Sequence, residues 1–158
     1  MRPAAQVETG AITTIPVLSV SPIKEDHLFL ECIFRNHCCW TPGNSNWKLY
    51  RRLTLESALT ALQENQIPIV ICERDLRPGS WKDMLERTKL LPTPPLLIVT
   101  SRLADEYLWA EALNLGAYDV AAKPFDSQEV RRIISFAWLH WNNKYPTVLP
   151  KVMTAHGS

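Results

Sequence analysis

The sequence predicts an α/β fold in which five parallel strands form one doubly wound sheet between two layers of helices. Three observations support this prediction. Short β-branched apolar runs alternate five times with segments of helical period. The links between them are short, as is typical of parallel strands that helices connect. The runs at 69–72 and 96–99 are continuously apolar, which is typical of strands buried on both faces.

The strands are recognised by their composition and by the residues that end them. The run 15–20 is apolar and stops at Ser21 and Pro22. Large apolar and basic residues alternate over 47–52, which is typical of an edge strand. The five expected strands are 15–20, 47–52, 69–72, 96–101 and 118–122.

The helices are recognised by apolar residues three and four positions apart and by the residues at their ends. Ser80, with Asp83 three residues later, predicts a capping box. Gly116 is a natural C-terminal cap, and Asp126 or Ser127 begins the last helix. The five expected helices are 25–36, 54–64, 81–90, 103–115 and 126–141.

Length and composition predict one soluble domain. The chain has 158 residues, of which 46% are hydrophobic and 21% charged, with a formal net charge of +1. This charge gives no broad footprint for nucleic acid or an anionic membrane, and the basic cluster Lys48, Arg51 and Arg52 is short. No apolar run approaches the length of a bilayer span, and the first residues lack a signal-peptide core. We therefore expect a cytoplasmic protein that binds neither nucleic acid nor membrane.

We expect a flexible leader at 1–14, a folded domain at 15–141 and a tail at 142–158. The four cysteines are Cys32, Cys38, Cys39 and Cys72, and they lack the spacing of a zinc site. They are expected to be reduced thiols, and His37 beside two of them has no second ligand cluster.

Polar side chains follow three of the expected strands at the point where each strand ends. Glu73 and Asp75 follow the third strand, Thr100 and Ser101 end the fourth, and Lys123 follows the fifth. Since function in open α/β sheets gathers at the carboxyl ends of strands, these side chains are candidates for one site. An acid, a hydroxyl and an ammonium suit the handling of a phosphoryl group. A purely structural Lys–Glu pair is the alternative.

Three segments carry a resemblance to a known family. The runs 73–79, 97–101 and 116–125, the last reading GAYDVAAKPF, resemble the receiver domain of bacterial two-component response regulators over about residues 15–141. The resemblance implies a flavodoxin-like (βα)5 fold, a three-layer sandwich, and a part in phosphorelay signal transduction. It places the family's hydroxyl on Thr100 and its lysine on Lys123.

The sequence also departs from the family. Ser21 and Pro22 occupy the positions of the acid pair that holds Mg²⁺, so Mg²⁺ binding is expected to be weak or absent and no cofactor is expected. The acids Glu25 and Asp26 are expected only to begin the following helix, where its dipole favours them. The phospho-accepting aspartate is replaced by Glu73, and Val120 stands where the family has an aromatic switch residue.

These departures suggest a degenerate receiver, a pseudo-receiver that is not an enzyme and does not depend on phosphorylation. A Glu73–Lys123 pair would hold it in one state, and it would act by binding proteins. The alternative is an active receiver phosphorylated on Asp75. A small flavodoxin-like enzyme is less favoured, because no glycine-rich loop follows the first strand.

The resemblance implies that the partner is a histidine kinase or a downstream regulator. It also implies that a homodimer could form through the fourth and fifth helices. Tyr107, Trp109 and Trp141 are candidates for the paired surface, and burial in the core is the alternative for these side chains.

Overall fold

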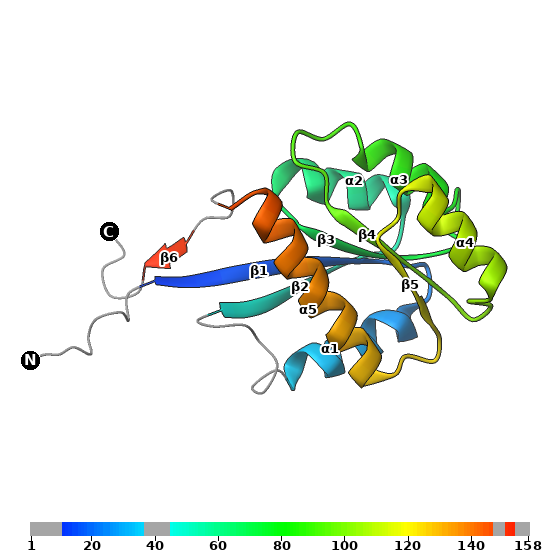
Figure 1. Cartoon of the computed structure of the whole chain (residues 1–158), viewed down its shortest axis with the longest axis horizontal. Helices are drawn as coiled ribbons and strands as arrows, with labels where there is room; N and C mark the ends of the chain where they lie inside the picture. Colours follow the sequence, from blue (N-terminus) through cyan, green and yellow to red (C-terminus); the bar gives the residue numbers. More distant parts are fainter. Residues whose placement is uncertain (1–10, 37–44, 147–150, 154–158) are drawn as a thin grey trace, which may run out of the picture.

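The computed structural model describes residues 11–36, 45–146 and 151–153, and they form a three-layer α/β structure (Figure 1). Five parallel strands lie in the order β2-β1-β3-β4-β5. The strands are β1 (Ala11–Val20), β2 (Ser45–Arg52), β3 (Ile69–Glu73), β4 (Leu96–Ser101), β5 (Asp119–Ala122) and β6 (Lys151–Met153). The helices are α1 (Lys24–Arg35), α2 (Leu55–Glu64), α3 (Trp81–Thr88), α4 (Glu106–Leu115) and α5 (Ser127–Lys144).

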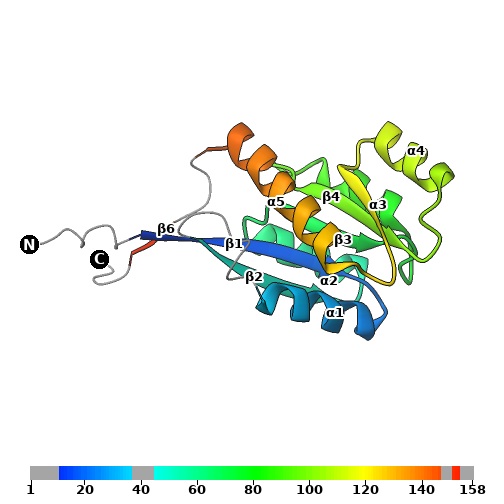
Figure 2. The ribbon, with the colours of Figure 1, turned by 60° about the horizontal axis from the view of Figure 1, so that its bottom comes forward.

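The helices divide between the two faces of the sheet, as Figures 1 and 2 show. Helices α1 and α5 cover one face, where Ile33, Ile134 and Trp141 belong to the same buried core as Val17 of β1. Helices α2, α3 and α4 cover the other face, and their apolar side chains form a second core with the opposite side of the strands. The predicted doubly wound, flavodoxin-like (βα)5 fold is therefore confirmed.

The strands bury their side chains as their composition predicts. All five residues of β3 are buried, and five of the six residues of β4 are buried. Strand β2 lies at one edge of the sheet, as its alternating basic residues predict. These positions agree with parallel strands covered on both faces.

Several of the predicted helix ends are confirmed by their hydrogen bonds. Ser80 and Asp83 form the capping box that begins α3, and Thr54 forms a second one with Ser57 at α2. Gly116 ends α4 with a φ of 109°, a left-handed conformation that glycine adopts without steric cost. Asp126 caps α5 through the N–H of Gln128.

The structure corrects several expected boundaries. Strand β1 begins at Ala11 rather than at residue 15, because its first residues pair in antiparallel fashion with β6. The expected leader therefore contributes to the sheet, and the expected tail supplies β6 and the last turn of α5, which ends at Lys144. Helix α4 begins at Glu106, later than expected, because Asp105 caps it. Pairing between distant segments leaves no local pattern in either of them.

His37, Cys38 and Cys39 lie outside the described residues. Of the helices in the described ranges, none combines the length and the apolar character that crossing a bilayer requires.

Candidate functional site

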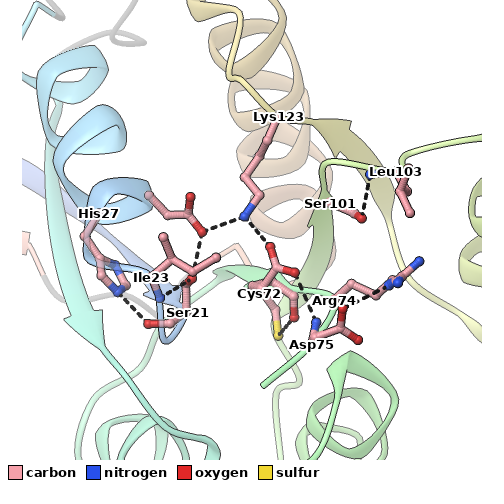
Figure 3. A network of polar contacts seen from close by, with 11 residues as sticks. Ser21, Ile23, His27, Cys72, Arg74, Asp75, Ser101, Leu103 and Lys123 are labelled. Atoms are coloured by element: carbon pink, nitrogen blue, oxygen red, sulfur yellow. Dashed lines mark hydrogen bonds and ion pairs between the residues drawn. The ribbon is translucent and has the colours of Figure 1, made fainter. Parts of the chain in front are cut away.

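The Lys123 ammonium lies between two buried carboxylates at the carboxyl edge of the sheet. Its Nζ is 2.8 Å from Oδ2 of Asp26 and forms a second ion pair with Oε1 of Glu73. All three residues are buried. Figure 3 shows Lys123 reaching into this cluster, with one dashed line to each carboxylate. The structure therefore brings together Glu73 and Lys123, as the sequence suggests, and adds Asp26.

Three separate elements supply the charges of this cluster. Glu73 ends β3, Lys123 follows β5 directly, and Asp26 lies in the first turn of α1, where the helix dipole favours a carboxylate. Further hydrogen bonds fix the carboxylates. The Ser21 hydroxyl donates to Asp26 Oδ2 at 2.7 Å, and the backbone N–H of Asp75 donates to Glu73 Oε2 at 3.1 Å.

The cluster holds two carboxylates for one ammonium. Taking charges out of water costs several kcal/mol per ion, which is offset only by close pairing and further hydrogen bonds. Lys123 supplies the pairing, while Ser21 and the Asp75 N–H supply hydrogen bonds. Each carboxylate therefore depends on Lys123, because no other cation contacts either of them within the described ranges.

A buried histidine extends the polar contacts behind the cluster. His27 Nε2–H donates to the carbonyl oxygen of Ser21 at 2.9 Å, and Nδ1 lies 2.8 Å from the Ser19 hydroxyl. These partners assign the proton of the neutral ring to Nε2. Burial lowers the pKa of His27 below its ordinary value, and the hydrogen bond to Ser21 offsets this only in part. His27 is therefore a neutral, fully bonded side chain beside Asp26.

Within the described residues no hydrogen bond joins the hydroxyl of Thr100 or of Ser101 to the cluster. Thr100 lies opposite Glu73 in the sheet register and is buried, but it shares a small apolar space with Leu30 and Ile133. The Ser101 hydroxyl accepts the N–H of Leu103 at 2.9 Å (Figure 3). The hydroxyl that contacts the charges is that of Ser21, on a different strand end from the one expected.

Asp75 lies outside the cluster. Its side chain is 70% exposed, and its Oδ2 is 3.4 Å from Nε of Arg74 (Figure 3). Only its backbone contacts Glu73. The two acids that follow β3 therefore differ completely in environment, although one residue separates them.

The residues at this edge do not fit Mg²⁺. Ser21 and Pro22 follow β1 and supply no carboxylate, and Lys123 bridges the two acids that are close together. No group of three or more histidine, cysteine, aspartate or glutamate side chains suited to a metal ion occurs in the described parts of the chain. Since Mg²⁺ prefers carboxylate and water oxygens in octahedral geometry, this donor set is poor for it.

Three other residues singled out in the sequence lie in the core. Trp141 is buried, and its indole N–H donates to the carbonyl oxygen of Pro94 at 3.1 Å, so of its two alternatives burial in the core is the one that the structure supports. Val120 is also buried, on the face that α4 covers. Burial raises the pKa of Cys72 well above its ordinary range, so this thiol is inert at neutral pH.

Sequence reasoning missed Asp26 as a member of the site. Acids in the first turn of a helix are common, so Asp26 was expected only to favour the helix start. The missed signal is its spacing. Asp26, Leu30 and Ile33 are related as i, i+4 and i+7, which places the acid on the apolar face of α1. An acid on a buried face requires a partner, and Lys123 is that partner.

Solved structures with this fold include several receiver domains. The chain is similar to the signal receiver domain of an HD domain-containing protein from Pseudomonas fluorescens, with 21% identity and a TM-score of 0.68 over 85% of this chain and 93% of that one. It is similar to a receiver domain protein from Clostridium thermocellum, with 18% identity and a TM-score of 0.67 over 84% and 98%. It is also similar to a chemotaxis response regulator of Vibrio cholerae, with 11% identity and a TM-score of 0.67 over 79% and 99%.

No protein-family model matches the chain, and no curated protein sequence matches it. The likeness is therefore one of structure, and it spans nearly the whole of each receiver domain. The chain has the fold of response regulator receiver domains.

Proposed function

We propose that this chain is a receiver-like domain of two-component signal transduction that works by binding proteins and does not depend on phosphorylation. The observation that supports this proposal best is the bridge that Lys123 forms between Asp26 and Glu73. The shared fold and the GAYDVAAKPF segment support the signalling class.

The chemistry of the cluster supports a fixed state. Phosphoryl transfer requires an acceptor in line with the donor and a cation that offsets the developing charge. Glu73 is one methylene longer than aspartate, and it already pairs with Lys123. Its carboxylate places a permanent negative charge near Lys123, as a phosphoryl group would, though with less charge. The pair therefore holds the domain in one conformation without a modification.

The proposed partners are proteins. A histidine kinase or a downstream regulator is the expected class, and the proposed place of action is the cytoplasm. Tyr107 and Trp109 of α4 and Phe136 of α5 are exposed aromatic residues that suit pairing of two copies through these helices. The domain needs no catalytic residue for this role.

Incubation with a small phosphodonor, such as acetyl phosphate, in the presence and absence of Mg²⁺ tests the proposal. Intact mass is measured for the wild type and for Asp75→Asn. We expect no added mass in either protein, because Glu73 is paired and no acid pair is present at Ser21 and Pro22. Mg²⁺ alone is expected to leave the melting temperature unchanged, since a ligand that binds the folded state would raise it.

Stoichiometric addition of one phosphoryl group to the wild type, lost in Asp75→Asn, would contradict the proposal and establish an active receiver. A receiver domain that has its acid pair and aspartate serves as the positive control for the phosphodonor.

A further inference from the structure

We propose that a hollow between α1 and β2 binds an acidic, leucine-containing segment of a partner protein. The hollow has a volume of about 310 Å³ and is lined by Lys24, His27, Leu28, Arg51 and Leu53. Figure 2 shows α1 beside β2 at this side of the sheet. The inference rests on the proposed function only in taking protein binding as the role of the domain, and it names where one partner binds.

The apolar part of the hollow consists of exposed leucine side chains. Leu28 is 55% exposed and Leu53 is 43% exposed, although they come from different elements. Phe29, the next residue of α1, is also exposed. Apolar side chains that gather at a concave surface favour the burial of a partner's apolar side chain. A leucine or a residue of similar size fits a hollow of this volume.

The polar part of the hollow is cationic. Lys24 is exposed and has no ion pair with any residue in the described ranges. Within the described residues the Arg51 side chain has one ion pair, a long contact of 3.4 Å with Glu31, and the two side chains are 48% and 33% exposed. Such surface pairs contribute little and exchange readily with another carboxylate. His27 adds no charge at neutral pH, because burial lowers its pKa below the ordinary value. Two cations beside two leucines therefore favour a ligand with a carboxylate next to an apolar side chain.

This combination favours a protein segment over other ligands. A nucleic acid would gain from the cations but not from the leucines, and the basic cluster on β2 is short. A glutamate or aspartate beside a leucine supplies both chemistries at once. The acidic Glu25 follows Lys24 on α1, but consecutive helical residues do not face the same side.

The hollow is joined to the buried cluster through a single turn of α1. His27 lines the hollow and donates to the carbonyl oxygen of Ser21. Asp26, its neighbour, accepts from the Ser21 hydroxyl and pairs with Lys123. A partner bound in the hollow therefore contacts the same turn that Lys123 holds in place. The same turn of α1 therefore contacts both the buried cluster and the occupant of the hollow.

The test uses the whole chain and a fluorescein-labelled synthetic peptide of twelve residues, with two adjacent leucines flanked by glutamates. Binding is followed by fluorescence anisotropy at low and high salt. Two matched peptides replace the glutamates by glutamine or the leucines by alanine. We expect saturable binding of the first peptide, weakened at least about tenfold by either replacement and weakened by salt, because both chemistries contribute.

The double variant Lys24→Glu/Arg51→Glu is expected to weaken binding at least about tenfold, and Leu28→Ser to weaken it severalfold. The matched control Arg102→Glu/Arg132→Glu changes the net charge equally at two exposed residues elsewhere and should bind as the wild type does. Circular dichroism confirms that each variant is folded. Chemical-shift changes on peptide addition should fall on residues 24–28 and 51–53.

Three outcomes would overturn the inference. One is the absence of saturable binding. Another is equal weakening by the control variant, which would indicate a non-specific charge effect. The third is self-association of the wild type that the Lys24→Glu/Arg51→Glu variant abolishes, which would assign the hollow to a second copy of this chain. None of these results affects the phosphodonor test, so failure of the hollow and failure of the proposed function remain distinguishable.

Discussion

A buried group of three charges and an exposed pair of charges lie at the carboxyl edge of the sheet, and their environments differ. The side chain of Lys123 is 5% exposed, while those of its partners Asp26 and Glu73 are 10% and 8% exposed. Arg74 and Asp75 form the exposed pair, with side chains 35% and 70% exposed. The buried group joins α1, β3 and the end of β5, while the exposed pair joins two consecutive residues.

Residue type alone does not determine how much an ion pair contributes to the stability of the fold. An exposed pair is screened by water and salt, and its median contribution is about 0–1 kcal/mol. A buried pair loses its hydration, so removing one partner leaves a costly uncompensated charge. Lys123 therefore fixes the relative positions of three elements, whereas Arg74 leaves the Asp75 carboxylate in solvent.

The variant Lys123→Met disrupts the buried ion pairs and should have the largest effect on the free energy of unfolding. It removes the cation and leaves Asp26 and Glu73 buried without it. We expect the free energy of unfolding to fall by about 3–5 kcal/mol. Urea-induced unfolding, followed by circular dichroism, measures this change. The matched variant Arg74→Met should cost less than about 1 kcal/mol. Equal losses in the two variants would contradict the comparison.

A decrease in pH should also destabilise the fold, by a smaller amount, through the buried side chain of His27 beside Asp26. Burial holds the pKa of His27 below the ordinary value of 6.5, so the unfolded chain takes up a proton at a higher pH than the folded chain does. Stability should therefore be full above that value and fall as the pH decreases below it. Urea unfolding from about pH 7.5 to about pH 5.5 measures the slope.

His27→Gln should flatten this slope, while His140→Gln, at an exposed histidine of α5, should leave it unchanged. A wild-type slope that persists in His27→Gln would show that other groups cause the acid sensitivity.

The fold could be predicted from the sequence because its signals are local. Continuous apolar runs at β3 and β4, the capping box at Ser80 and the C-terminal cap at Gly116 each act within a few residues. The pairing of β1 with β6 could not be predicted, because it joins residues 11–13 to residues 151–153 and neither segment has a distinctive pattern.

The site could be predicted only in part, for a related reason. Glu73 and Lys123 follow strands that are neighbours of β4, so their convergence follows from topology. Asp26 lies on a helix, and its first-turn position hid its place on the buried face. Thr100 was expected at the charges because it lies at the end of a strand, yet within the described residues no hydrogen bond joins its hydroxyl to Lys123 or to the two carboxylates.

A pair of double-mutant cycles tests the central claim most directly, since they measure how strongly the buried charges depend on one another. One cycle uses Lys123→Met and Glu73→Gln, and the other uses Arg74→Met and Asp75→Asn. Unfolding free energies of the single and double variants give each coupling energy. We predict a coupling of about 1–3 kcal/mol for the buried pair and at most about 0.5 kcal/mol for the exposed pair. A buried coupling no larger than the exposed one would contradict the claim that Lys123 and Glu73 hold this domain in one state.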